Sequence, residues 1–297
     1  MLDKKVNILL SAYNGEKYIE EQLKSLLAQA YPHIEIYVRD DGSTDGTAAI
    51  LKEYEARGQI TFLQGENIGF CASFFALLAA AEQGDYWSFC DQDDIWFPGK
   101  VGAAIDWLNA QNGDGPLLYH SAFEMVDAEG NPLGKFAPPP YPFDFRTCMT
   151  GTLFLGFSTV INRPLRDAML RCDPRECDAH DWLAGTVALA FGRAHLDMEI
   201  RATYRRLVES VSGSSFKRRV SWLLASMRQS NVKRRNREFS RVFASELDEE
   251  KSRVMRLFGG KTCSLAASLK KAFYPKRWRP SISSELSIRF LMLIGKV

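Results

Sequence analysis

Three carboxylates crowd into the stretch FCDQDDIWFP, residues 89–98, at the end of an apolar run. Asp91 and Asp93 have D-x-D spacing, which lets both side chains point the same way from an extended strand end. Crowded carboxylates repel one another and lose hydration, so this arrangement indicates a positively charged ligand. Oxygen ligands suit Mg²⁺ or Mn²⁺, and magnesium sites often combine one or two carboxylates with substrate phosphates. The alternative is a solvated acidic turn that caps the next helix.

The segments before this cluster alternate between two patterns. VNILLSAYN and HIEIYVRDDG are short apolar runs that end in turn formers, as buried parallel strands do, and each precedes a stretch with helical spacing. The alternation occurs four times within about a hundred residues, which predicts an α/β fold with a mostly parallel sheet flanked by helices. Ligands of such sheets bind at the carboxyl ends of the strands. The polar clusters at these ends are 11–14, 40–45, Asn67 and 91–94.

The remaining elements follow a different order. PLLYHSAFEMVDAEGNPLG predicts two strands around a turn, and APPPYP predicts an extended connector. GTLFLGFSTVINRPL predicts a strand that enters a helix, and CDAHDWLAGTVALAFG a helix with His-Asp-Trp near its start. From about residue 214 the chain is expected to be mostly helical and basic. We therefore predict an α/β domain over 1–213 and a basic helical region over 214–297.

Charge is distributed unevenly along the 297 residues. Residues 201–297 hold 23 Lys and Arg against 7 Asp and Glu, whereas the net charge of the whole chain is only +2. Such a split predicts an acidic body and a basic tail with an anionic partner. The segment 215–243 mixes Lys and Arg with Trp222, Phe239 and Phe243, and the stretches LKKAFYPKRWRP and IRFLMLIGKV follow it. Such basic stretches with apolar and aromatic residues are typical of a helix on an anionic bilayer. No nucleic-acid motif accompanies the charge. The alternative is a helical appendage that packs on the body or on a second copy.

The sequence also bears on the compartment. No apolar run of 18 residues appears, and the N-terminal MLDKKVNILLSAYNG predicts a first strand rather than a signal peptide. The six cysteines lack the spacing of a disulfide framework, which favours a reducing cytoplasm. Cys172, Cys177 and His180 have no fourth ligand with which to form a structural zinc site.

SAYNGEKYIEE, DDGSTDGT, ENIGFCASF and FCDQDDIW, in this order, resemble the motifs of family 2 glycosyltransferases of the GT-A fold, over residues 5–215. CDQDDIW with a later HDW is similar to bacterial rhamnosyltransferases of surface-polysaccharide assembly. The resemblance implies inverting, metal-dependent transfer of a sugar to a lipid-linked saccharide. It also implies a donor such as dTDP-rhamnose, with a UDP-sugar as the alternative. The place of action would be the cytoplasmic face of the bacterial cell membrane, with the enzyme bound peripherally.

The resemblance further implies roles for residues on the donor side. Asp41 would hydrogen-bond the base, whereas Asp40 would assist it or only hold the turn. Asp91 would touch the ribose or the metal, and Asp93 would bind the Mg²⁺ or Mn²⁺ ion that bridges the two phosphates. The other residues that would line the nucleotide are Ser11, Tyr13, Asn67 and Gly69.

On the acceptor side, AHDWLAG matches the position of the family's catalytic base. Asp181 is therefore the candidate base, although an Asp at a helix start can equally be a cap. His180 would support it, and Trp182 would be a platform for a sugar ring or part of the core. YRRLVESVSG departs from the family pattern, because Leu207 stands where a His is expected. Arg205 or Arg206 would then neutralise the diphosphate, since a guanidinium pairs well with phosphate.

Two other functions are compatible with parts of the pattern. A nucleotidyltransferase would also use an α/β sheet and Mg²⁺, but it usually needs a Gly-rich basic loop after the first strand, which SAYNGEKY is not. A non-catalytic, membrane-bound scaffold could keep the same fold. The presence of Asp91, Asp93 and Asp181 argues against a scaffold. A homo-oligomer formed through residues 214–297 remains open.

Overall fold

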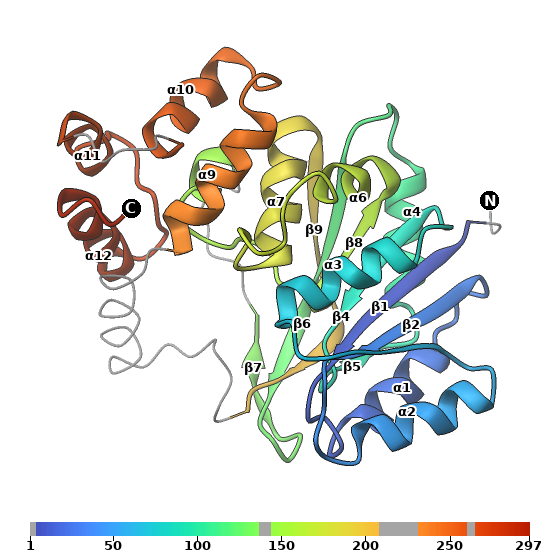
Figure 1. The fold of residues 1–297 in the computed structure, drawn as a ribbon. Coiled ribbons are helices and arrows are strands. Elements are labelled where there is room, and N and C mark those ends of the chain that lie inside the picture. Colours follow the sequence, from blue (N-terminus) through green and yellow to red (C-terminus); the bar gives the residue numbers. More distant parts are fainter. Residues whose placement is uncertain (1–3, 137–143, 208–230, 260–264) are drawn as a thin grey trace.

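The computed structural model describes residues 4–136, 144–207, 231–259 and 265–297, and the connector APPPYP, Trp222 and residues 208–213 lie outside these ranges. Its centre is a nine-stranded sheet with the order β3-β2-β1-β4-β8-β6-β9-β5, and β7 pairs with β6 (Figure 1). The first four strands are mutually parallel, as the sequence predicted. These strands are β1 Val6–Ala12, β2 Ile34–Asp40, β3 Thr61–Gln64 and β4 Tyr86–Cys90.

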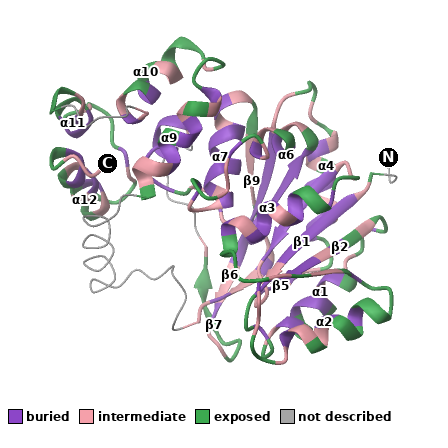
Figure 2. Cartoon of the chain, in the orientation of Figure 1, coloured by how far each residue is buried: buried purple, intermediate pink, exposed green. Residues whose placement is uncertain are grey.

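The helices between these strands cover both faces of the sheet. Strand side chains alternate between two hydrophobic clusters, so that Leu9 lies in one while Ile8 and Leu10 lie in the other. One cluster takes residues from α1, α2 and α4, and the other from α3, α6 and α7. Figure 2 shows the buried strands enclosed by helices with exposed outer faces. The helices are α1 Ile19–Leu27, α2 Thr47–Ala56, α3 Phe70–Ala80, α4 Lys100–Asn109, α6 Arg163–Met169 and α7 His180–Phe191.

The second half of the sheet is mixed. β8 runs antiparallel to β4, and β6 runs antiparallel to β8 and parallel to β9. The predicted pair of strands around the turn at residues 129–131 is present as β6 and β7, whereas β9 was not predicted. These elements are β5 Ile95–Trp96, β6 Leu117–Val126, β7 Pro132–Lys135, α5 Phe145–Cys148, η1 Gly156–Ser158, β8 Thr159–Asn162 and β9 Arg193–Arg205.

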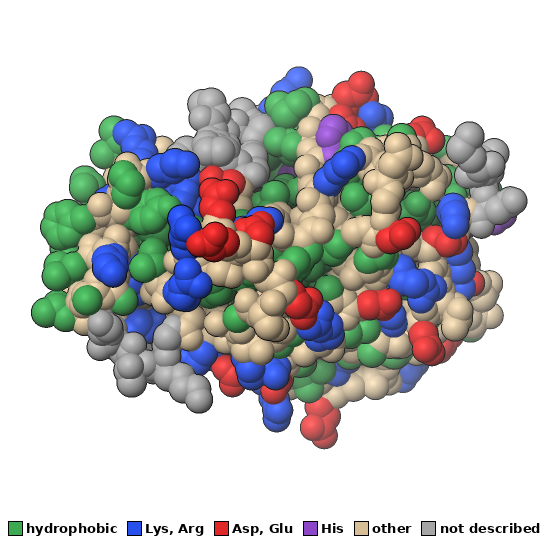
Figure 3. Space-filling view, turned by 90° about the horizontal axis from the view of Figure 1, so that it is seen from above, with side chains coloured by type: hydrophobic (Ala, Val, Ile, Leu, Met, Phe, Trp, Pro, Cys, Tyr) green, Lys and Arg blue, Asp and Glu red, His purple; other side chains and the backbone are tan. Residues whose placement is uncertain are grey.

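The C-terminal helices pack on the body. Phe239 and Phe243 of α9 are fully buried in the cluster that also holds Trp182 of α7. The prediction that these two phenylalanines face a membrane is therefore wrong, because both contribute to the core. Figure 3 shows hydrophobic and basic side chains side by side on the end of the molecule that the last helices form. The helices are α9 Asn231–Phe243, α10 Glu249–Phe258, α11 Leu265–Ala272 and α12 Ile282–Leu293.

Within the described ranges, no helix combines the length and the apolar character needed to cross a bilayer.

Candidate active site

The predicted donor-side residues gather at one edge of the sheet. In the parallel register Ala12 pairs with Asp40 and Leu10 pairs with Cys90, so the carboxyl ends of β1, β2 and β4 lie beside one another. The residues that follow these ends include Tyr13, Asp41 and Asp91. The sequence pattern therefore located this edge correctly.

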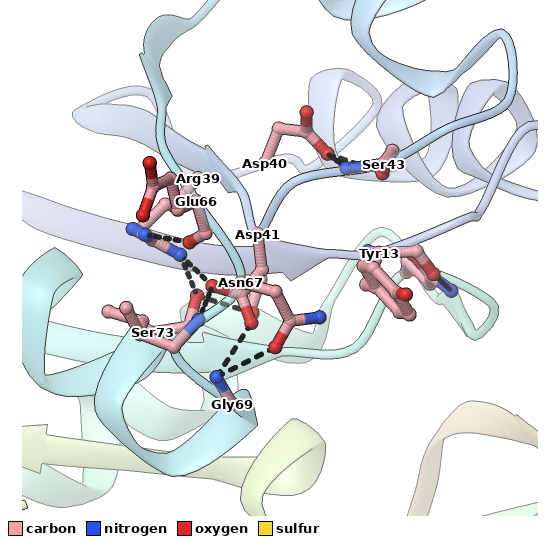
Figure 4. A network of polar contacts seen from close by, with 12 residues as sticks. Tyr13, Arg39, Asp40, Asp41, Ser43, Glu66, Asn67, Gly69 and Ser73 are labelled. Atoms are coloured by element: carbon pink, nitrogen blue, oxygen red, sulfur yellow. Dashed lines mark hydrogen bonds and ion pairs between the residues drawn. The ribbon is translucent and has the colours of Figure 1, made fainter.

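Asp41 holds the loop that leads into α3 (Figure 4). Its Oδ1 accepts the Ile68 N–H at 2.9 Å and its Oδ2 accepts the Gly69 N–H at 3.0 Å, while the Arg39 guanidinium pairs with the same carboxylate. The Oδ1 of Asn67 also accepts the Gly69 N–H, at 3.2 Å. Gly69 has φ of +84° at the start of α3, a left-handed conformation that favours glycine. Asp41, Asn67 and Gly69 thus form one structural unit, and contact with a base stays a prediction for them.

The two carboxylate oxygens of Asp40 differ in their contacts. Its Oδ1 accepts the N–H and the hydroxyl of Ser43, whereas its buried Oδ2 has no partner among the described residues. A buried acceptor without a donor is costly, so this oxygen is suited to a ligand N–H or to an ordered water. The turn after it needs a glycine, because Gly42 has φ of +82° and a Cβ there would lie 2.9 Å from the Asn67 nitrogen.

The end of β1 is tied to the D-x-D loop through Gln92. The Tyr13 N–H donates to Gln92 Oε1 at 2.8 Å, and Gln92 Nε2 donates to the Tyr13 carbonyl at 3.1 Å. The Tyr13 ring stays 47% exposed, which leaves it available for stacking. The hydroxyl of Ser11, which was predicted to line the nucleotide, donates to Ser73 Oγ of α3 at 2.7 Å. Sequence reasoning missed Gln92, whose position between the two aspartates was its only signal.

The acidic cluster is poorly compensated. Burial raises the pKa of Asp91, and the charges of Asp93 and Asp181 raise it further. Burial also raises the pKa of Asp93 and of Asp94, and the buried Oδ2 of Asp94 has no partner among the described residues. Lys100 interacts with Asp94, but burial lowers the pKa of its ammonium group to about 7. At neutral pH these carboxylates therefore favour an additional cation.

A divalent cation fits this environment. Within the described ranges, no group of three or more His, Cys, Asp and Glu side chains forms a complete metal site. Half-buried Asp91 and Asp93 would therefore hold a Mg²⁺ or Mn²⁺ ion together with phosphate oxygens or water, as is common for magnesium.

Asp181 lies in the first turn of α7, near the acidic cluster. Its carboxylate accepts the Trp182 N–H at 2.7 Å and also the Gly156 N–H. Burial raises the pKa of Asp181 to about 6, against the opposing effect of these two donors. The charge of Asp181 in turn raises the pKa of Asp91, and the ring centroid of the adjacent His180 lies 4.5 Å from that of Phe89 on β4, so the two carboxylates lie near each other. Their joint role in one reaction stays a prediction. A pKa slightly below neutrality suits a general base.

The two residues that flank Asp181 are buried and are not exposed on the predicted acceptor side. Trp182 is 1% exposed and its Nε1 donates to the Cys148 carbonyl at 2.7 Å, so the prediction of a sugar platform is wrong and Trp182 is core. His180 is 3% exposed and its ring centroid lies 3.9 Å from that of Phe74. Burial lowers the pKa of His180 to about 3, which keeps the ring neutral. Neither side chain faces an acceptor, and His180 supports the start of α7 by packing.

Arg205 also has a different role from the predicted one. Its Nε donates to the Asp93 carbonyl at 3.0 Å, and its two terminal nitrogens donate to the Ala128 carbonyl at 3.1 Å and to Glu21 Oε2 at 2.8 Å. Its backbone N–H donates to Asp94 Oδ1 at 3.0 Å. All three guanidinium nitrogens of this buried side chain bind protein oxygens, so Arg205 holds the acidic loop and does not present its charge to a diphosphate.

The structure says less about the two residues that follow Arg205. The Arg206 N–H donates to the Val126 carbonyl at 2.8 Å, and its side chain is half-buried. Phosphate binding by Arg206 stays a prediction, as does the consequence of Leu207 in place of the expected His.

Arg205→Ala is expected to lower the free energy of unfolding by about 2–4 kcal/mol, because two carbonyls and a carboxylate lose a charged donor. Urea denaturation followed by circular dichroism measures the change. Arg253→Ala is the matched control. Among the described residues, exposed Arg253 forms an ion pair with exposed Glu249 on α10, so its replacement should cost far less. Equal losses in the two variants would show that the buried contacts of Arg205 do not stabilise the loop.

Comparisons with known sequences identify the family of this chain. The model of the family described as "Glycosyl transferase family 2" matches residues 7–163. The putative teichuronic acid biosynthesis glycosyltransferase TuaG of Bacillus subtilis is 29% identical over 217 residues, which cover 71% of this chain and 83% of that protein. The dTDP-rhamnosyl transferase RfbG of Shigella flexneri is 40% identical over 111 residues, 35% of this chain and 38% of that protein. The uncharacterized glycosyltransferase RC0461 of Rickettsia conorii is 34% identical over 133 residues, and the match covers 45% of this chain but only 22% of that protein.

Solved structures resemble the fold over almost the whole chain. TarS 1-349 of S. aureus in complex with UDP has a TM-score of 0.56 at 18% identity, with 92% of this chain and 75% of that chain covered. The mannosyltransferase PcManGT of Pyrobaculum calidifontis, in complex with GDP-Man and Mn²⁺, has a TM-score of 0.53 at 17% identity, with 99% and 76% covered. At these identities the likeness shows the fold alone.

Proposed function

Because this chain belongs to glycosyltransferase family 2 and has the GT-A fold that its sequence predicted, we propose that it transfers a sugar with inversion from a nucleoside diphosphate to a saccharide. One observation carries the proposal: Asp181 lies in the first turn of α7, where the ring centroid of its neighbour His180 is 4.5 Å from that of Phe89 on β4, and its charge raises the pKa of Asp91. A base for the acceptor and a carboxylate pair for the donor thus share one site.

The contacts support the following proposed roles on the donor side. Asp40 Oδ2, buried and unpartnered among the described residues, is the acceptor for a base N–H, and Asp41 keeps the loop next to it in place. Tyr13 stacks on the base or ribose with its exposed ring. The proposed donor is dTDP-rhamnose, which the name of the Shigella relative supports. A UDP-sugar is the alternative, because TarS 1-349 of S. aureus, whose fold is similar, has also been solved in complex with UDP-GlcNAc.

In the proposed reaction Asp181 acts as the general base. The acceptor hydroxyl oxygen attacks the anomeric carbon, the bond from that carbon to the diphosphate oxygen breaks, and Asp181 takes the hydroxyl proton. A Mg²⁺ or Mn²⁺ ion held by Asp91 and Asp93 supplies positive charge next to the leaving diphosphate when it is bound. Attack on the face opposite the leaving group inverts the anomeric centre.

The acceptor and the place of action are also part of the proposal. The name of TuaG supports a growing saccharide of surface-polysaccharide synthesis, which we propose to be lipid-linked. Residues 214–297 would then be the region that brings the body, residues 1–213, to the inner face of the cell membrane, with oligomer formation as the alternative. The excess of 23 Lys and Arg over 7 Asp and Glu in residues 201–297 supports an anionic partner.

A screen of nucleotide sugars by thermal shift in the presence of Mn²⁺ tests the donor. A ligand at about 100 times its Kd stabilises a protein by about 2.7 kcal/mol, so dTDP-rhamnose is expected to raise the Tm by several degrees. Free rhamnose is the control and should cause no shift. Slow hydrolysis of the stabilising donor without acceptor would then separate an enzyme from a scaffold. If no nucleotide sugar changed the Tm, the proposed donor site would be wrong.

A further inference from the structure

The two last helices present apolar side chains to solvent. On α11 and the residue after it, Leu265, Leu269 and Phe273 recur at intervals of four, which places them along one face of the helix. All three are between 41% and 73% exposed. On α12, the exposed apolar residues are Ile282, Leu286, Phe290 and Leu293. We call these seven side chains together the α11–α12 apolar face.

α12 is apolar on two opposite sides. Ile288, Leu291 and Met292 are fully buried in the core, so one side already serves the packing of the helix on the body. At 3.6 residues per turn, Leu286 and Phe290 lie on the other side. A surface helix normally turns polar residues outward, and a helix that is apolar all round is normally buried. The folding of the described residues therefore does not account for the outer apolar side of α12.

Within residues 265–297 the exposed charge is of one sign. Residues 265–297 contain seven Lys and Arg and a single acidic residue, Glu285. Glu285 is buried, pairs with Arg289 at 2.5 Å and accepts the Trp278 N–H at 2.9 Å, so its negative charge is compensated inside the protein. Lys270 and Lys276 are exposed. Figure 3 shows this mixture of hydrophobic and basic side chains at the end of the molecule that the helices form.

We propose that the α11–α12 apolar face docks on the headgroup region of an anionic lipid bilayer, with Phe273 and Leu286 inserted toward the acyl chains. Apolar side chains flanked by cations match such a surface in both of its components. A second copy of the chain matches it less well, because self-association would bring the exposed lysines of the two copies together. The inference rests on the proposed membrane location. It narrows the contact to α11 and α12, because Phe239 and Phe243 of the segment 215–243 are buried.

Cosedimentation of the full chain with lipid vesicles tests the proposal. The chain is expected to bind vesicles of phosphatidylcholine mixed with phosphatidylglycerol, and to bind pure phosphatidylcholine about tenfold less. The variant Phe273→Ser/Leu286→Ser/Phe290→Ser should bind the mixed vesicles about tenfold less or worse than the parent chain. Lys270→Glu/Lys276→Glu should lose binding most strongly at low salt. The matched control is Leu133→Ser/Met198→Ser, which removes two comparably exposed apolar side chains from β7 and β9 and should bind like the parent.

Two results would overturn the proposal. One is that the parent chain ignores anionic vesicles, or that the triple variant binds them as well as the parent does. The other is that the triple variant changes from dimer to monomer in light scattering while its vesicle binding stays unchanged, which would make a second copy the occupant. The donor-induced thermal shift of the triple variant reports on the catalytic site separately. An intact shift with lost or absent vesicle binding leaves the proposed transferase function standing.

Discussion

Asp181→Asn is expected to slow sugar transfer by about 10²–10⁴-fold while leaving donor affinity unchanged. The amide has the shape of the carboxylate but cannot take a proton from the acceptor hydroxyl. Its oxygen can still accept the Trp182 N–H, which the carboxylate Oδ1 accepts in the parent chain, so the first turn of α7 should keep its geometry. The initial rate of nucleoside diphosphate release measures the loss, and isothermal titration with the donor measures the affinity.

Asp178→Asn is the matched control for this variant. Asp178 stands three residues earlier, pairs with Arg235 at 3.3 Å and acts on Asp181 only through its charge. Its replacement should change the rate by a few-fold at most. Full turnover by Asp181→Asn, or an equal loss in both variants, would remove Asp181 from the role of base.

The pH dependence gives an independent check on the same residue. Burial raises the pKa of Asp181 to about 6, and a general base must be ionised to act. The kcat/KM of the parent chain should therefore rise as the pH increases through about 6 and level off above it. The residual activity of Asp181→Asn should lack this rise, because its amide does not titrate there.

The sequence predicted the elements whose signal is local. β1, β2 and β4 are short apolar runs that end in turn formers, and α1 carries apolar residues at helical spacing. The structure confirmed each of them within a few residues. β9 was missed because its 13 residues mix charged and apolar side chains that are mostly half-exposed, and its pairing with β6 is a contact between distant parts of the chain.

Individual side chains near the site were harder to place, and for the same reason. Trp182 is core because Phe239 and the Cys148 carbonyl close over it, and both lie far away in the sequence. Arg205 binds Glu21, which precedes it by 184 residues, so no local pattern indicated that its charge is already paired. Motif position placed Asp91 at a strand end and Asp181 near a helix start, as the structure has them, because both are local features. Their roles in the reaction stay predictions. The side chains around a motif depend on packing that no single segment encodes.

Asp93→Ala is expected to weaken donor binding about 10–100-fold or more in the presence of Mn²⁺. The side chain of Asp93 is half-buried in a cluster where burial raises the pKa of all three carboxylates, so its ionised form gains most when a cation is present. The loop itself should survive the change, because Arg205 holds it through the Asp93 backbone carbonyl, which alanine retains. Titration of the donor with Mn²⁺ and with EDTA measures both affinities.

The comparison between the two conditions decides what the loss means. If Asp93 acts through a cation, EDTA should bring the parent chain down to the affinity of Asp93→Ala, and the variant should respond little to Mn²⁺. Asp94→Ala is the structural control. Asp94 Oδ1 accepts the Arg205 N–H inside the protein and alanine removes that acceptor, so this variant should lower the Tm of the free chain, whereas Asp93→Ala should not. Unchanged, metal-independent donor binding by Asp93→Ala would mean that the D-x-D carboxylates do not grip the diphosphate through a cation, and the acidic cluster would need another explanation.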